Sequence, residues 1–422
     1  MPFDSGDTTW ILLAGSLVLL MVPALALFEA GLLRKKNTVS VFMQVFFGLA
    51  FLSMMWFAFG FSMAFGPDRS GGIIGSLDWS FLNGVPWDKP LGHYAPTIPG
   101  VAFSQFQMVV AVVTPLLLTG VIAERMKFKA FIIFMIAWSI FIYYPLVHWV
   151  WGEGGWLGQL GVVDFAGGIV IHTSAGMSAI AAALVLGRRK NFGPAIMVPH
   201  NIPMAVFGAA LLWVGWFGFN AGSAFSSGSV SANTIIVTHI ASSASAIVWV
   251  GLSWRRTGKP SVISAINGAL AGLVGITAAS GFVSVGNAAI IGFAVGFASY
   301  YGVSFFKDRL KIDDALDVSS FHGISGIIGS LSIGLFASTL VNHAGVNGLF
   351  YGNPHQLLLQ AMGVGVAIVL GFGGTFIIMK ILQKTIGVRV TPEVEEQGLD
   401  MGEHAEEAYS DEEEFKLDQD DD

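Results

Sequence analysis

The strongest constraint on the fold of this chain is a series of long apolar stretches. A helix that crosses the hydrocarbon core of a bilayer needs about 20 predominantly apolar residues. Eleven stretches meet this condition: Trp10–Leu32, Val41–Phe65, Gly100–Ala123, Phe128–Trp149, Phe165–Leu186, Asn201–Ala221, Ala232–Trp254, Val262–Ser280, Ala288–Phe306, Val318–Val341 and Gln356–Ile381. Because a helix satisfies its backbone hydrogen bonds within one segment, the sequence predicts an all-α polytopic membrane protein with eleven transmembrane helices.

The composition excludes several other classes of protein. Charged residues make up only 12% of the 422 residues, against roughly 25% in soluble domains, and the mean hydropathy is +0.69. This balance argues against a soluble enzyme, a nucleic-acid-binding protein and a secreted disulfide scaffold. The chain has no cysteine, which rules out disulfides, zinc–cysteine sites and cysteine-held iron–sulfur clusters. We therefore expect a multi-pass protein of the cell membrane that needs no cofactor or metal.

The basic residues predict how the chain is oriented. They cluster after every odd-numbered stretch, within residues 34–36, 125–129, 188–190, 255–259, 307–311 and 380–389. Only Arg69 and Lys89 lie in the opposite loops. Because cytoplasmic loops carry an excess of Lys and Arg, we expect the N-terminus outside and the C-terminus inside. The first nine residues carry only Asp4 and Asp7 as charged side chains, so we expect no cleavable signal peptide.

The fifth and tenth stretches share a spaced pattern. Asp164 precedes His172 by eight residues and Asp314 precedes His322 by eight; a glycine follows each histidine by four, at positions 176 and 326. Five stretches separate the two copies, so the two helices run in opposite directions. This arrangement is typical of an inverted-topology repeat, whose interface often holds a transport site.

The repeat divides the chain into four parts. We expect a first five-helix repeat over residues 1–190, with an extracellular loop at about 66–99, and a second, inverted five-helix repeat over 191–345. An eleventh helix occupies 346–387, and an acidic cytoplasmic tail occupies 388–422. From Glu393 onward there are fifteen acids and one base, whereas the rest of the chain has a net charge of +7. We expect the tail to order against the body or a partner, with the run Asp411–Glu414 as a solvated end.

Four ionisable residues within or beside the stretches are candidates for function. An ionisable side chain inside a membrane is costly and usually functional, so we favour a functional role for His172 and His322 over hydrogen-bonded packing. Glu29 lies near the end of the first stretch and is a further candidate. For Asp164 we favour structural support as the N-cap of the fifth helix.

Several segments together carry a resemblance to a known family. They are 123–125 (Ala-Glu-Arg), 164–172, 199–203, 215–223, 317–323 and 398–409. Across nearly its whole length the chain resembles the ammonium transporter, methylammonium permease and Rhesus family, and its tail and compact length favour the microbial ammonium transporter branch. The resemblance implies a homotrimer in membrane lipid, with a separate narrow pore for ammonium or its analogue methylammonium in each protomer.

The resemblance also implies roles for particular residues. Outer recruitment of ammonium maps onto Phe106, Trp151 and Ser223, the gate below it onto Phe219, and the twin pore histidines onto His172 and His322. Where many members have a second gate phenylalanine, this sequence has Val110. Each residue also has an alternative reading: Trp151 as an interfacial aromatic, Phe106 and Phe219 as packing residues, and Ser223 as a partner of a backbone carbonyl. For Trp216 we favour packing.

Two functions follow from these observations. The first is an ammonium transporter that deprotonates ammonium and conducts ammonia, with or without separate proton transfer. The second is an ammonium sensor that docks a PII-type signal protein and transports little. An intramembrane enzyme is rejected because the sequence has no His-Glu-x-x-His, Gly-x-Ser-x-Gly or Walker motif.

Overall fold

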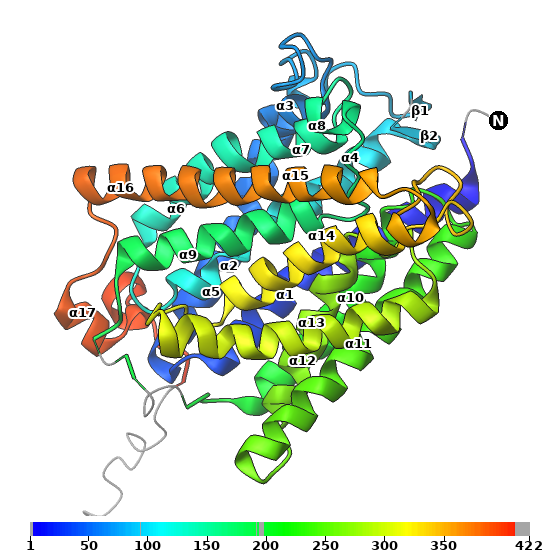
Figure 1. The fold of residues 1–422 in the computed structure, drawn as a ribbon. Helices are drawn as coiled ribbons and strands as arrows, with labels where there is room; N and C mark the ends of the chain where they lie inside the picture. The colour runs from blue at the N-terminus through cyan, green and yellow to red at the C-terminus, as the bar shows by residue number, and fades with distance from the viewer. Residues whose placement is uncertain (1–2, 93, 191, 194–197, 410–422) are drawn as a thin grey trace, which may run out of the picture.

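The protein is described by a computed structural model covering residues 3–92, 94–190, 192–193 and 198–409. Figure 1 shows a bundle of helices with one small sheet. The α-helices are α1 (Ser5–Leu32), α2 (Thr38–Met55), α3 (Phe61–Phe65), α4 (Gly100–Leu116), α5 (Thr119–Ile122), α6 (Phe128–Trp138), α7 (Tyr144–Trp151), α8 (Trp156–Gln159), α9 (Ser174–Leu186), α10 (Ile202–Gly222), α11 (Ser229–Thr257), α12 (Val262–Thr277), α13 (Val285–Ser304), α14 (Ser325–Phe336), α15 (His355–Val369), α16 (Thr375–Thr385) and α17 (Pro392–Gln397).

Shorter elements continue or connect these helices. The 3₁₀ turns are η1 (Lys35–Asn37), η3 (Ser80–Leu82) and η8 (Leu349–Tyr351). The π-helical segments are η2 (Trp56–Gly60), η4 (Ser139–Tyr143), η5 (Gly168–Thr173), η6 (Phe305–Arg309), η7 (Ser319–Ile324), η9 (Leu370–Gly374) and η10 (Asp400–His404). The strands β1 (Pro90–Leu91) and β2 (Ala95–Pro99) pair antiparallel, with Leu91 opposite Ala95.

The membrane-spanning helices follow the apolar stretches. Within the described ranges, ten helices are long and apolar enough to cross a membrane: Ser5–Leu32, Lys35–Phe65, Gly100–Ile122, Phe128–Gln159, Gly168–Leu186, Ile202–Gly222, Ser229–Thr257, Val285–Arg309, Ser319–Phe336 and His355–Thr385. The helix α12 is also apolar but has only 16 residues. The expected all-α multi-pass membrane protein is thus confirmed, while the count of eleven spans and their orientation stay predictions.

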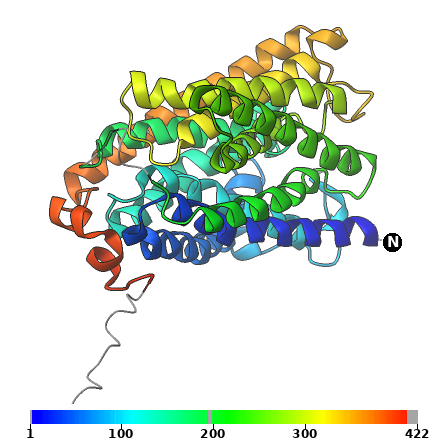
Figure 2. The same cartoon turned by 90° about the horizontal axis from the view of Figure 1, so that it is seen from below.

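The two ends of the bundle carry different segments. Figure 1 shows the start of α1 and the strands β1 and β2 at one end, and α17 at the opposite end. We call the first end the loop side, because it holds the connection 66–99, and the second the tail side, because it holds residues 388–409. Figure 2 shows the blue helices α1 and α2 along one side of the bundle and the yellow helices α13 and α14 toward the other. Among the described residues, the helix pair in most extensive contact is α1 with α10.

Two buried, non-helical segments lead into the helices that carry the histidines. Residues 161–167 precede η5, and residues 312–318 precede η7. Their backbone groups find partners on other elements: the Phe165 N–H donates to the Ala278 carbonyl (3.1 Å), and the Leu316 N–H donates to the Gly120 carbonyl (3.2 Å). The Val163 N–H donates to the Gln360 side chain (3.0 Å). Irregular backbone is tolerated at membrane depth only when it is satisfied inside the protein in this way.

Two helix boundaries differ from those expected for the fifth and tenth apolar stretches. The fifth spanning helix begins at Gly168 instead of Phe165, and the tenth ends at Phe336 instead of Val341. Asp164 is the physical reason at the first boundary, because its carboxylate binds the first free N–H groups of the helix and leaves Phe165 outside it.

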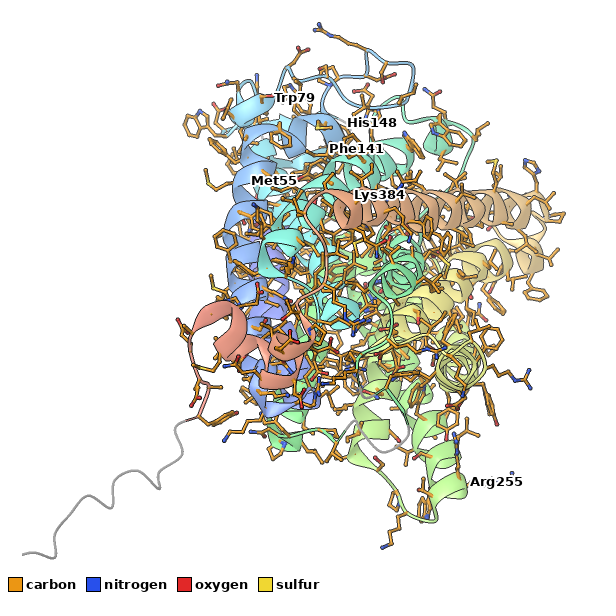
Figure 3. The ribbon with its side chains drawn as sticks, turned by 90° about the vertical axis from the view of Figure 1, so that its left-hand side faces the viewer. Met55, Trp79, Phe141, His148, Arg255 and Lys384 are labelled. Atoms are coloured by element: carbon orange, nitrogen blue, oxygen red, sulfur yellow. The ribbon has the colours of Figure 1, made fainter. Side chains whose placement is uncertain are left out.

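The tail folds back onto the body of the protein. The Lys127 N–H donates to the Val388 carbonyl and the Val390 N–H donates to the Arg125 carbonyl, both at 3.0 Å. Farther on, the Asp400 carboxylate accepts from the Ser40 N–H at 2.8 Å. Figure 3 shows this segment (salmon) against the bundle, with Arg255 at the end of α11 well apart from it. The acidic run 411–414 lies outside the described residues.

Candidate functional site

His172 and His322 meet in the interior of the bundle. Their Nδ1 atoms are 3.1 Å apart and their ring centroids 5.1 Å apart. Because a neutral imidazole has one N–H donor and one acceptor nitrogen, one Nδ1–H donates to the other Nδ1 and the two rings must be opposite tautomers. The π-helical segments η5 and η7 each carry one of these histidines, and such segments are frequent at functional sites.

The glycines of the repeated pattern explain why the two helices approach so closely. A Cβ atom on Gly176 would lie 2.0 Å from the Gly323 nitrogen, and one on Gly326 would lie 2.9 Å from the Cβ of His172. Each glycine therefore packs against the backbone beside the other helix's histidine. Because these contacts involve residues 172–176 and 322–326, the two helices cross near their N-terminal ends, within about 12 Å of helical rise from each start.

Aromatic side chains stack on His172. The Trp216 ring centroid is 5.7 Å and the Phe219 ring centroid 6.2 Å from that of His172, with both rings within 30° of parallel to it. The Trp216 Nε1–H donates to the Thr277 hydroxyl at 2.9 Å. Trp216 thus combines the packing role expected of it with direct contact to the histidine pair.

A cavity of about 340 Å³ opens on the loop side of this stack. Its lining includes three residues that the resemblance links to ammonium recruitment: Phe106, Trp151 and Ser223. The Ser223 hydroxyl donates to the Phe219 carbonyl at 3.0 Å. Its proton is thereby used, which leaves the oxygen lone pairs free to accept. Ser223 can therefore bind a backbone carbonyl through its proton and still accept a hydrogen bond from ammonium.

The two residues expected at the gate, Val110 and Phe219, do not form a stacked pair of aromatic rings. Val110 lines the loop-side cavity, whereas Phe219 is 2% exposed and lies beneath it, stacked on His172. In the described part of the chain, the aromatic neighbours of Phe219 are His172 and Trp216. Phe106 instead packs edge-on against Phe225, at 5.7 Å between centroids.

Asp164 holds the start of the helix that carries His172. Its two carboxylate oxygens accept from the backbone N–H groups of residues 167, 168, 169 and 170 at 2.7–3.0 Å. This arrangement serves an N-terminal cap. The carbonyl of Asp164 also accepts from the Trp151 Nε1–H at 2.7 Å, so the same residue ties the cavity wall to the start of the helix.

A second, smaller cavity lies on the tail side of the histidine pair. Its volume is about 50 Å³, and among the described residues its only titratable lining groups are Glu29 and His322. A series of contacts, Ser223 to Phe219, Phe219 to His172 and His172 to His322, joins this cavity to the loop-side cavity. Phe219 and the two histidines thus lie between the two cavities, both of which are lined mostly by apolar side chains.

A largely buried ion-pair network lies on the tail side of the bundle. The Glu124 carboxylate binds the Arg34 Nε at 2.9 Å and the Arg189 Nη1 at 2.7 Å, while Asp313 binds Arg189 at 2.6 Å. Burial alone would raise the pKa of the Glu124 carboxyl, but Arg34 and Arg189 outweigh burial and hold its pKa below the usual value. In the same way, Arg189 and Arg125 hold the pKa of Asp313 below its usual value despite burial.

Sequence reasoning misses several lining residues of the loop-side cavity, five phenylalanines among them. Phe165, Phe225 and Phe282 all face it. Phe165 sits in the buried non-helical segment, and Phe225 adopts a left-handed backbone conformation (φ 51°). No pattern in the sequence marks such positions among the 34 phenylalanines; only the stretch of small residues before Phe225 hints at a turn.

The fold defines a multi-pass membrane protein whose interior holds a pair of contacting histidines between two cavities. The model of the Ammonium Transporter Family matches residues 9–409. The chain therefore belongs to the Ammonium Transporter Family.

Two curated relatives illustrate the likeness in sequence. Ammonium transporter 1 of Dictyostelium discoideum is 53% identical over 409 residues, which cover 96% of this chain and 88% of the relative. The ammonium transporter of Bacillus subtilis is 44% identical over 406 residues, which cover 96% and 99%.

Solved structures show the same fold. Mep2 of Saccharomyces cerevisiae superimposes with a TM-score of 0.87 at 31% identity, over 93% of this chain and 89% of that chain. A structure named Sensor Amt Protein superimposes with a TM-score of 0.86 at 32% identity, over 94% and 98%.

Proposed function

We propose that this protein transports ammonium, binding it in the loop-side cavity and conducting ammonia past His172 and His322. The observation that carries this mechanism is the contact of two imidazoles, 3.1 Å between Nδ1 atoms, inside a path that is otherwise lined mainly by apolar side chains. Family membership supports ammonium or ammonia as the substrate.

The loop-side cavity has the chemistry to select ammonium. Potassium is similar in size, so selection has to use the four N–H donors and the labile proton that potassium lacks. The faces of Phe106 and Trp151 attract a cation, and the free lone pairs of Ser223 accept one N–H. These three residues together line the cavity.

Removing a proton lets the substrate pass the narrow part of the path. Burying an unpaired charge in an apolar medium costs many kcal/mol, whereas ammonia is small and uncharged. Two imidazoles that share one hydrogen bond offer ammonia a donor or an acceptor nitrogen. Double protonation would bring like charges into contact, so the pair holds at most one extra proton and does not become a trap for cations.

The assembly and the direction of transport belong to the same proposal. The distribution of basic loops supports the loop side as the outside, and the resemblance supports a homotrimer with one pore in each protomer. The inverted five-helix repeat supports two half-pores that meet at the histidines.

The experiment is ammonium flux through purified protein in liposomes, measured as current and as internal pH. His172→Ala and His322→Ala are expected to lower ammonium-dependent flux about 10-fold or more, or to admit potassium, because each removes one ring of the pair. The matched control is His239→Ala, an exposed histidine on α11 that lines neither cavity. Wild-type flux and selectivity in both pore variants would overturn the mechanism.

A PII-type signal protein at the tail side is the second proposal. The likeness to the structure named Sensor Amt Protein supports it, and so does a tail that makes many contacts with the neighbouring loops. If purified full-length protein bound a PII protein but supported no ammonium flux, sensing would replace transport as the main function.

A further inference from the structure

Glu29 is a buried acid that lines the tail-side cavity and has no role in the transport steps described so far. It lies three residues before the end of α1, at 2% exposure. In the described part of the chain, no Lys, Arg or His nitrogen forms an ion pair with its carboxylate. Because a buried ionised carboxylate without a cation is costly, such a group binds a proton, or an ammonium ion, when one is available.

The hydrogen bonds of Glu29 fit both of its charge states. Its Oε2 is 2.8 Å from the Thr119 hydroxyl oxygen, and that hydroxyl is also within hydrogen-bond distance of the Leu116 carbonyl. A hydroxyl has one proton. When Thr119 donates to Glu29, the acid is a carboxylate; when Thr119 donates to Leu116, the protonated acid donates to Thr119. The site therefore accepts or releases a proton by rotation of one hydroxyl, without moving the backbone.

The surroundings of Glu29 place it on the transport path. Glu29 and His322 line the same cavity of about 50 Å³, which has room for a molecule of the size of water or ammonia. Leu316 and Val318, from the segment that precedes η7, face it from the other side. The charged group that acts on Glu29 from that segment is Asp314, whose Oδ2 accepts from the Ser319 N–H at 2.6 Å.

We propose that Glu29 is the proton-exchange group at the tail-side end of the pore, a role that rests on the proposed ammonium transport. Ammonia that has passed His322 takes the proton of the Glu29 carboxyl: the O–H bond breaks, an N–H bond forms, and ammonium leaves toward the tail side. The carboxylate then takes a proton either from the imidazole pair, which had received it from the incoming ammonium, or from a hydronium ion on the tail side; in both cases the O–H bond of Glu29 is restored and every proton is accounted for.

The test uses full-length protein in liposomes, with ammonium-dependent flux measured while the pH on the tail side is varied. Glu29→Gln keeps the size of the side chain and an oxygen acceptor for Thr119, but it cannot exchange a proton. We expect a maximal flux roughly 10- to 100-fold lower, a flattened dependence on tail-side pH, and an unchanged half-saturating ammonium concentration on the loop side. Glu29→Asp is expected to retain part of the flux with a shifted pH dependence.

The controls separate this proposal from transport itself. Glu393→Gln makes the same change on an exposed tail residue and is expected to behave as wild type. Absence of flux in the wild-type protein would overturn ammonium transport, whereas wild-type flux and pH dependence in Glu29→Gln would overturn only the role of Glu29. Should Glu29→Gln fail to fold, Thr119→Val takes its place, because it removes the shared hydroxyl; an unchanged pH dependence in that variant would also refute the proposal.

Discussion

At the scale of single residues, the hydroxyl of Ser223 illustrates how one side chain can serve the helix and the substrate together. By donating to the Phe219 carbonyl at 3.0 Å, it fixes its lone pairs toward the loop-side cavity. An acceptor held in this way needs no reorientation when a cation with N–H donors arrives, which is the condition for selective recognition.

Replacing Ser223 tests how much its hydroxyl contributes to the binding of ammonium in the loop-side cavity. Ser223→Ala is expected to raise the half-saturating ammonium concentration about 10-fold, since a hydrogen bond to a charged group contributes about 1.5 kcal/mol, and to leave the maximal flux nearly unchanged. The measurement is the concentration dependence of ammonium current. Ser16→Ala is the matched control, because Ser16 makes the same bond to the carbonyl four residues earlier on an exposed face of α1. An equal rise in both variants would count against recognition by Ser223.

Some residues of the site are predictable from sequence and others are not. The histidines stand out because an ionisable group within an apolar stretch is rare, and Asp164 stands out because an acid just before a helix satisfies free N–H groups. Phe106, Trp151 and Ser223 were found only through the family resemblance. Phe165 and Phe225 are not predictable from the sequence because their positions depend on irregular backbone, which no periodic pattern encodes.

At the scale of helices, the crossing of η5–α9 with η7–α14 depends on two glycines. The Cβ of an alanine at position 176 would lie 2.0 Å from the Gly323 nitrogen, which is backbone and cannot move aside alone. Overpacking of this kind costs about 1–3 kcal/mol and would separate the two imidazoles.

Gly176→Ala is therefore expected to lower thermal stability in detergent by about 1–3 kcal/mol and to lower ammonium flux with it. Gly365→Ala on α15 is the matched control, because nothing lies within 4 Å of its added Cβ and alanine favours a helix by up to about 1 kcal/mol. A Gly176→Ala protein with unchanged stability and flux would show that close backbone contact is dispensable.

The sequence predicts which segments form membrane helices, but it does not predict where the fifth and tenth of these helices begin. Apolar length identifies a membrane helix because lipid offers no other partner for the backbone. Counting along the fifth and tenth stretches cannot reveal that both helices start inside the bundle. Their starts are fixed by long-range bonds, such as the one from the Phe165 N–H to the Ala278 carbonyl. The contact of His172 with His322 follows from those starts.

At the scale of the whole molecule, the tail-side ion-pair network ties distant parts of the chain together. Glu124 follows α5, Arg34 follows α1, and Arg189 follows α9, while Asp313 comes from the segment before η7. All four partners lie at the boundary between the spans and the tail, so the network acts on the stability of the whole protein.

This network predicts a loss of stability in acid. Arg34 and Arg189 hold the pKa of Glu124 below its usual value of 4.5, and the pKa of Asp313 lies below its usual 3.8. Groups with a lowered folded-state pKa stabilise the protein fully above the unfolded-state pKa, and this stabilisation is lost as the pH falls through the folded-state pKa. Thermal unfolding in detergent should thus shift to lower temperature as the pH is lowered below about 4.5.

Removing one acid of the network should flatten this dependence. Glu124→Gln is expected to cost about 3–5 kcal/mol at neutral pH, because it leaves buried arginine charge uncompensated, and to weaken the loss in acid. Glu406→Gln, on an exposed tail residue, should change neither. A Glu124→Gln protein with the wild-type dependence on pH would show that other groups control acid unfolding.

The small tail-side cavity also bears on the energetics of the cell that contains this protein. Among the described residues that line it, all but Glu29 and His322 are unable to ionise, so a continuous file of water has few polar partners along this stretch. For the proposed transport path, we therefore expect no conductance of sodium, potassium or bare protons. A membrane holding many copies is then expected to keep its voltage and proton gradient while ammonium is absent.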